Sequence, residues 1–281
     1  MVKKGFLTIH IKRSVMFDMI NEVKQPQLLA ISGIESLGLR ESMSLFFNEF
    51  NRSVDRKLAA LKGSLHEVDY RSTQRYLVDK DVLFVRNAGQ EITVPEYFSG
   101  AMGEMETYTR HLINGIFILN NLKTETTRLY DWMKSIVKKG RMDKSFSWSV
   151  SDFDQCLEQT EVFIKELDSN NKAKFPLDQV YLQFNDAFML MNQYNQAIKA
   201  IKARDIEILT RDITAVYDIG SLLVTKIEAN DILLSKEALV DIQLIINNYV
   251  GLVNVAGVVT GLLNELTAVF QRQLEEFRKM K

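Results

Sequence analysis

The stretch that decides the fold is DIQLIINNYVGLVNVAGVVTGLLNE, residues 241–265, which carries no charged side chain between Asp241 and Glu265. As a helix, its interior, residues 242–264, is longer than the roughly 20 residues that cross the hydrocarbon core of a bilayer. Several side-chain amides lie inside it, and each costs a few kcal/mol in hydrocarbon when it has no partner. They are Gln243, Asn247, Asn248, Asn254 and Asn264.

Apolar residues continue the helical spacing of three and four beyond both charged ends of this window. They are Leu239, Ile242, Ile246, Tyr249, Val253, Leu263, Phe270, Leu274 and Phe277. A helix buried on one side explains that continuity, whereas a membrane span does not. Gly257 and Gly261 form a GxxxG pattern, which permits close helix approach in membranes and in soluble bundles. We therefore predict a core helix, and keep membrane insertion of residues 242–264, as in helical pore-forming toxins, as an alternative.

The composition is that of an ordinary globular protein. Of the 281 residues, 46% are hydrophobic and 25% are charged, and the formal net charge is -1. This balance predicts a packed core. It provides no global basic field that would attract nucleic acid or an anionic membrane. We therefore expect neither a sequence-specific nucleic-acid partner nor a membrane partner.

Apolar periodicity predicts long helices over most of the chain, separated where the three prolines occur. The predicted fold is mainly α, an antiparallel bundle of long helices with a short strand or arm at the N-terminus. Predicted helices cover 39–63, 95–140, a segment after Ser151, and about 176–202, 204–228 and 235–279. We divide the chain into an N-terminal arm or propeptide (1–35), a helix, hairpin and long helix (36–140), and a helical bundle (141–281) that packs against the preceding segment.

Residues 82–94, VLFVRNAGQEITV, interrupt the helical pattern. Two runs of β-branched or aromatic residues flank Asn87-Ala88-Gly89-Gln90, where asparagine and glycine tolerate the positive φ of a tight turn. We therefore predict a small β-hairpin over about 82–94.

Side chains that carry chemistry are sparse and scattered. The three histidines, His10, His66 and His111, lie outside the spacings of zinc and di-iron sites. Cys156 stands among acidic neighbours, a setting that disfavours a nucleophilic thiolate. Neither a P-loop nor a dinucleotide-binding glycine motif occurs. We therefore predict a protein that is not an enzyme, with no cofactor and no metal site.

An aromatic group flanks the polar loop that follows Gly140. It consists of Tyr130, Trp132, Phe146 and Trp148. Such residues form a contact patch for a partner, or they close one end of a bundle. The sequence leaves both alternatives open.

Residues 32–58, SGIESLGLRESMSLFFNEFNRSVDRKL, lead from a short polar segment into an amphipathic helix that carries Phe46 and Phe47. This stretch resembles the start of virion structural proteins of large tailed bacteriophages, including internal head proteins. The resemblance of general plan extends to about residue 140. It implies a structural protein located in the virion.

In such phages a prohead protease removes a propeptide after a sequence of the type small-x-Glu. Gly33-Ile34-Glu35 fits this pattern, so the resemblance implies a processing site there and a mature chain that begins at Ser36. Residues 89–91 and 235–237 fit the same pattern.

Long apolar helices without a reaction motif favour a structural or assembly protein that contacts other virion subunits or copies of itself. The alternatives are a phage-encoded interaction or adaptor protein in the cytoplasm of the infected bacterium, and a membrane-active helical protein that uses residues 242–264. The arm and the hairpin would offer strand edges or patches to neighbouring subunits. The predicted contact residues are Phe6, Ile9, Ile11, Phe84 and Ile92.

Overall fold

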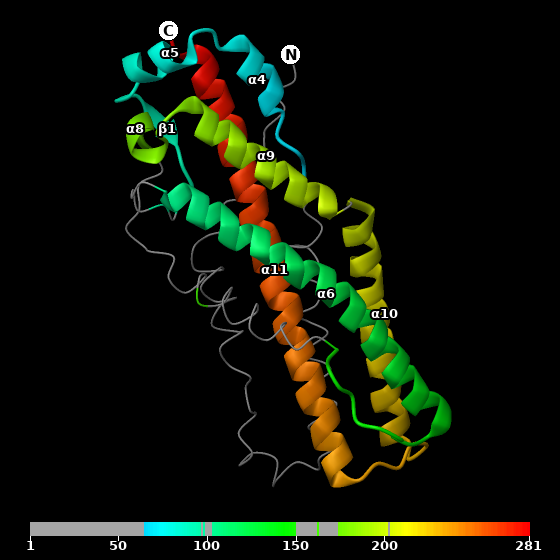
Figure 1. The fold of residues 1–281 in the computed structure, drawn as a ribbon. Helices are drawn as coiled ribbons and strands as arrows, with labels where there is room; N and C mark the ends of the chain where they lie inside the picture. Colours follow the sequence, from blue (N-terminus) through cyan, green and yellow to red (C-terminus); the bar gives the residue numbers. More distant parts are fainter. Residues whose placement is uncertain (1–64, 97, 99–102, 150–161, 163–173, 202) are drawn as a thin grey trace, which may run out of the picture.

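The computed structural model describes residues 65–96, 98, 103–149, 162, 174–201 and 203–281 (Figure 1). Within these residues the chain forms seven helices and one two-stranded antiparallel sheet. The mainly helical class with a small antiparallel sheet is therefore confirmed. The predicted arm, the predicted helix over 39–63 and the one after Ser151 lie outside the described residues.

Helix α6, Glu104–Lys139, is the predicted long helix that follows Pro95. It ends at Gly140, whose φ of 70° is left-handed and whose N–H donates to the Ile136 carbonyl at 2.9 Å. Glycine adopts this conformation without the steric cost that a Cβ imposes. Acidic residues in the first turn and lysines in the last turn complement the helix dipole.

The last three long helices follow the sequence prediction closely. Helix α9 covers Phe184–Ala200, α10 covers Ala203–Glu228, and α11 covers Lys236–Lys279. Two short helices come before α9 in the chain. They are α4 at Tyr70–Tyr76 and α8 at Leu177–Val180. The hydroxyl of Ser235 accepts the Ala238 N–H at 3.2 Å and caps α11, as a serine at that position predicts.

Helix α11 runs antiparallel to α6 and crosses it at close range. The hydroxyls of Thr126 and Tyr249 lie 2.8 Å apart, and a Cβ built on Gly115 would lie 2.6 Å from Cγ1 of Val259. As the residue number rises along α6, it falls along α11. Gly115 in α6 lies at this close approach, whereas a Cβ on Gly261 of α11 would meet no atom within 4 Å.

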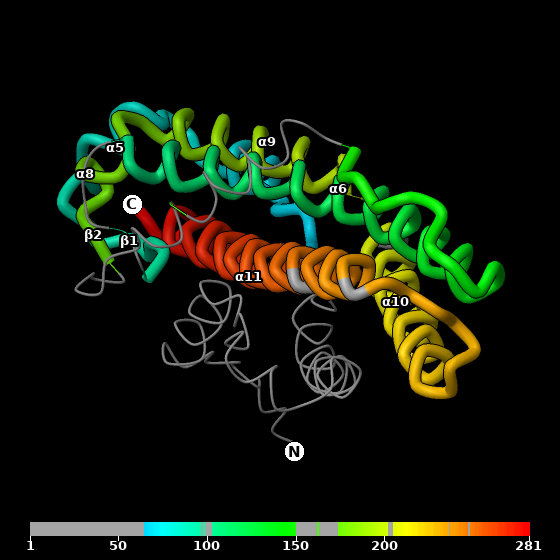
Figure 2. Tube along the Cα trace, turned by 90° about the horizontal axis from the view of Figure 1, so that it is seen from below, coloured from blue at the N-terminus to red at the C-terminus, as the bar shows by residue number. Residues whose placement is uncertain are grey.

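Helices α9 and α10 run in the same direction as α6, so among the long helices that the structure describes only α11 runs antiparallel to the others (Figures 1 and 2). Lys123 in α6 pairs with Asp205 at the start of α10 at 3.1 Å, and Gly140 lies beside the Asp231 carbonyl after α10. The parallel direction arises because residues 141–149 fold back along α6, toward its N-terminal half. The later helices can therefore run in the same direction as α6.

The opening stretch lies inside the protein. In α11, Leu252, Val253, Val255, Ala256, Val258 and Val259 are at most 6% exposed. Most of the amides avoid the core, since Asn248 is exposed and Gln243 and Asn264 are partly exposed. Within the described part, one helix is long and apolar enough to cross a membrane, Glu237–Lys279, and most of its apolar window is buried. A core helix passes the same test.

Asn254 is a buried amide whose desolvation is not fully compensated by hydrogen bonds. It is 3% exposed, and its Oδ1 has no hydrogen-bond partner. Aromatic contacts complete the core toward the end of α11, with Phe277 against Phe184 at 5.0 Å and Phe270 against Tyr194 at 5.5 Å between ring centroids.

The predicted hairpin is wrong in its first half and in its pairing. Residues Lys80–Arg86 form helix α5, and strand β1, Glu91–Thr93, pairs with β2, Lys174–Pro176, in place of residues 82–86. Phe84 packs edge-on against Phe184 at 5.3 Å, a contact that the helix supplies. Tertiary packing therefore overrides the strand preference of the local sequence.

Candidate functional site

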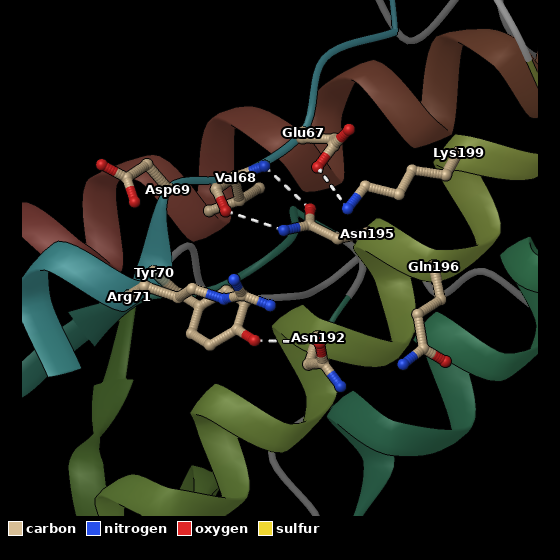
Figure 3. Close-up of a pocket in the computed structure, with 9 residues that line it drawn as sticks. All are labelled: Glu67, Val68, Asp69, Tyr70, Arg71, Asn192, Asn195, Gln196 and Lys199. Atoms are coloured by element: carbon tan, nitrogen blue, oxygen red, sulfur yellow. Dashed lines mark hydrogen bonds and ion pairs between the residues drawn. The ribbon is translucent and has the colours of Figure 1, made fainter.

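A pocket of about 230 Å³ lies between the extended segment before α4 and the exposed side of α9 (Figure 3). Its lining is polar and carries both signs of charge. The lining residues are Glu67, Val68, Asp69, Tyr70, Arg71, Asn192, Asn195, Gln196 and Lys199.

Asn195 holds the backbone of Val68 with both ends of its side-chain amide. Its Nδ2 donates to the Val68 carbonyl at 2.8 Å, and the Val68 N–H donates to its Oδ1 at 2.8 Å. One turn earlier in α9, Asn192 accepts the Tyr70 hydroxyl at 2.9 Å. Because Asn195 and Val68 are both buried, these bonds satisfy groups that water does not reach.

The charges in the pocket are engaged or solvated. Lys199 pairs with Glu67 at 3.2 Å, and both side chains are about half exposed. Arg71 is exposed, and its hydrogen bond with Tyr70 raises the guanidinium pKa further above its ordinary value. Arg71 therefore stays a cation at any working pH. The nine lining residues include no histidine and no cysteine. The pocket offers hydrogen bonds and charge pairing, but Asn195 already holds the Val68 backbone and Asn192 already holds the Tyr70 hydroxyl.

A second polar cluster fastens β1 to α11. Gln273 donates from Nε2 to the Thr93 carbonyl at 2.7 Å and accepts the Tyr181 hydroxyl at 2.9 Å. The Thr93 N–H and hydroxyl donate to the Glu276 carboxylate at 2.8 and 2.7 Å. Burial raises the pKa of Tyr181, so this hydroxyl remains a neutral donor.

Glu265 lies next to this cluster on α11 and accepts the Glu96 N–H at 3.1 Å. Desolvation is the main reason that its pKa is raised above the ordinary value, opposed by the Glu96 N–H and assisted by the negative charge of Glu96. This carboxylate positions the chain after β1, and its charge is unfavourable there.

A third cluster binds the segment 141–149 to α6. Glu125 is 1% exposed and accepts hydrogen bonds from the N–H of Ser149, at 2.9 Å, from the Ser149 hydroxyl and from Arg128. Arg128 also donates to the Ser147 carbonyl at 2.8 Å. The buried carboxylate is thus paired and fully hydrogen-bonded, the condition under which a buried charge is tolerated.

The aromatic group predicted from the sequence belongs to the same cluster. Phe146 lies between Trp132 and Trp148, with centroids 5.6 and 5.0 Å apart, and the Trp132 Nε1–H donates to the Lys144 carbonyl at 2.9 Å. These rings are partly buried against α6. They fix the returning segment to α6.

The structure corrects the described part of the predicted contact set. Phe84 is 7% exposed and Ile92 is 0% exposed, so both belong to the core and cannot face a neighbouring subunit in this fold. Phe6, Ile9 and Ile11 lie outside the described residues, and so do Gly33, Ile34, Glu35 and Ser36. No group of three or more potential metal-ligating side chains occurs among the residues in the described ranges.

The sequence did not mark Asn195, Gln273 or Glu276. Each acts on backbone far away along the chain, and a single amide or carboxylate on a helix gives no local signal of such a role. No family model, curated protein or solved structure matches this chain.

Proposed function

We propose that this protein is a non-enzymatic structural component that acts through protein–protein contacts. The observation that supports this proposal is the use of its polar groups. The amide of Asn195, the carboxylates of Glu125 and Glu276 and the guanidinium of Arg278 each hold a distant part of the same chain. Polar groups that form hydrogen bonds within the chain make the fold more rigid, and they are not available to bind a substrate.

The shape of the body fits the same role. Helix α11 has 44 residues, which corresponds to about 66 Å at a rise of 1.5 Å per residue. It is packed against α6, against α4 and against the sheet along much of this length. A long helix supported in this way transmits load between two ends of a molecule, as a scaffold requires.

The specific form of the proposal is a head-associated protein of a tailed-bacteriophage virion. It rests on the resemblance of residues 32–58, which lie outside the described residues. An adaptor protein of the infected cell would share the helical body and would differ in location.

Peptide mass spectrometry of purified particles, compared with the lysate of infected cells, separates these two functions. Enrichment of the chain in the particles, with a new N-terminus at Ser36, is the expected result. A chain found in the lysate and missing from the particles would contradict the virion assignment and leave the adaptor.

A further inference from the structure

Helix α5 has two faces of opposite character. Its inner face carries Phe84, packed against Phe184 at 5.3 Å. Its outer face carries Val82 and Val85, which are 60% and 75% exposed. This seven-residue helix therefore leaves two β-branched side chains in water on the face opposite its core contact.

The neighbourhood of this face is also apolar. Tyr76 and Val78, which directly precede α5, are 64% and 74% exposed. Together with the two valines of α5 they expose on the order of 500 Å² of mostly apolar surface between residues 76 and 85. A standard stable interface buries about 800 Å² on each partner, so these side chains would supply only part of one.

The charges that flank the valines make the face complementary to itself. Asp81 lies on one side of the Val82–Val85 stripe and Arg86 lies on the other, and both are exposed. Neither side chain forms an ion pair inside the part of the chain that the structure describes. In heptad terms Asp81 takes position g, the valines take a and d, and Arg86 takes e.

That order specifies a parallel pairing of identical helices. When two such helices lie parallel about a two-fold axis, the a and d side chains meet their equivalents, and a residue at g lies opposite the e residue five positions later in the partner. Asp81 of one copy then faces Arg86 of the other, and the contact occurs twice by symmetry. An antiparallel pairing would bring Asp81 beside Asp81 and is disfavoured.

The position of α5 leaves room for a second copy. It lies across the end of the elongated body where the chain also ends (Figure 1), and Asn87 after α5 donates from Nδ2 to the carbonyl of Lys281 at 3.2 Å. An end-to-end pair therefore avoids contact between the long sides of the two bodies.

We propose that the outer face of α5 docks a second copy of this chain in a parallel two-fold pair, with the valines at its centre and Asp81–Arg86 ion pairs at its flanks. The proposal rests on the proposed structural function and names the surface through which copies join. Because α5 has two turns, the contact is weak, with a dissociation constant on the order of 10 µM.

Sedimentation velocity of the full chain at concentrations from about 1 to 100 µM tests the pairing, with circular dichroism of each variant as the check on folding. The expected result is a reversible dimer. Asp81→Arg and Arg86→Asp should each weaken it about tenfold, since each places like charges in contact, and Val85→Glu should abolish it. The double variant Asp81→Arg with Arg86→Asp should restore it to within about threefold.

Lys144→Asp, a charge reversal outside α4 and α5, is the matched control and should leave the dimer unchanged. A chain that stays monomeric at 100 µM would overturn the proposal, and so would a dimer indifferent to Val85→Glu or a double variant as weak as the single ones. If the chain is monomeric and still enriched in particles, only the proposed pairing through the outer face of α5 is refuted. If the chain is absent from particles, the virion function is refuted, and sedimentation alone decides whether the dimer forms.

Discussion

Substitution of Gly115 by alanine tests the crossing of α6 and α11 at its tightest point. The added Cβ would lie 2.6 Å from Cγ1 of Val259, closer than carbon atoms tolerate, and 3.1 Å from Cγ2, a tight contact. Val259 is buried and β-branched, so it has little freedom to rotate away. The two helices must shift instead.

Two opposing effects set the magnitude. Replacing glycine by alanine inside a helix stabilises by about 0.5–1 kcal/mol, whereas overpacking a rigid core costs about 1–3 kcal/mol. We expect Gly115→Ala to lower the free energy of unfolding by about 1–2 kcal/mol. Urea denaturation followed by circular dichroism measures this difference.

Controls within the same chain separate the clash from helix propensity. A Cβ on Gly261 meets no atom within 4 Å, so Gly261→Ala should raise the free energy of unfolding by about 0.5–1 kcal/mol. In a Val259→Ala background the clashing methyl groups are gone, and Gly115→Ala should become neutral or stabilising. If Gly115→Ala stabilises the wild-type protein as Gly261→Ala does, the close crossing of α6 and α11 is wrong.

Three further substitutions test the polar clusters. Asn195→Ala leaves the two buried backbone groups that its amide holds without partners and should cost about 2–4 kcal/mol in urea denaturation, while Gln196→Ala, in the same pocket, should change stability by less than about 0.5 kcal/mol; equal effects would refute the backbone clamp. Glu125→Ala should release residues 141–149, so that trypsin cleaves there faster than in wild type, and an unchanged cleavage rate would count against the returning segment. The raised pKa of Glu265 means that its carboxyl stabilises the fold when protonated, below its ordinary value of 4.5, and loses this contribution as the pH rises through the folded pKa. Glu265→Gln should therefore be more stable than wild type at pH 7 and equal to it at pH 4, and a variant less stable at pH 7 would contradict this sign.

The long helices were predictable because each carries an apolar stripe over many turns and a clear end signal. Ser235 before α11 and Gly140 after α6 marked two boundaries through local chemistry, as cap and as left-handed terminus. The burial of residues 241–265 also followed from the sequence, since the stripe continued past both charged ends of the window.

Features that depend on contacts between distant parts of the chain were not predictable. Val82 and Val85 suggested a strand, yet they lie exposed on a helix that Phe84 anchors to the core. Helices α6 and α10 run in the same direction because residues 141–149 fold back along α6. The apolar periodicity of the sequence does not predict this fold-back. The clamp on Val68 depends on one amide, 127 residues away along the chain.

Hydrogen exchange of the purified full chain, followed by mass spectrometry, tests most directly whether residues 241–265 form the buried spine of the protein in solution. Peptides from residues 249–270 should be among the slowest to exchange in the molecule, because both their side chains and their helical hydrogen bonds are enclosed by the bundle. Complete exchange of these peptides within seconds, while α6 and α9 stay protected, would contradict a buried core helix. It would favour insertion of this stretch into a membrane or its binding to a partner.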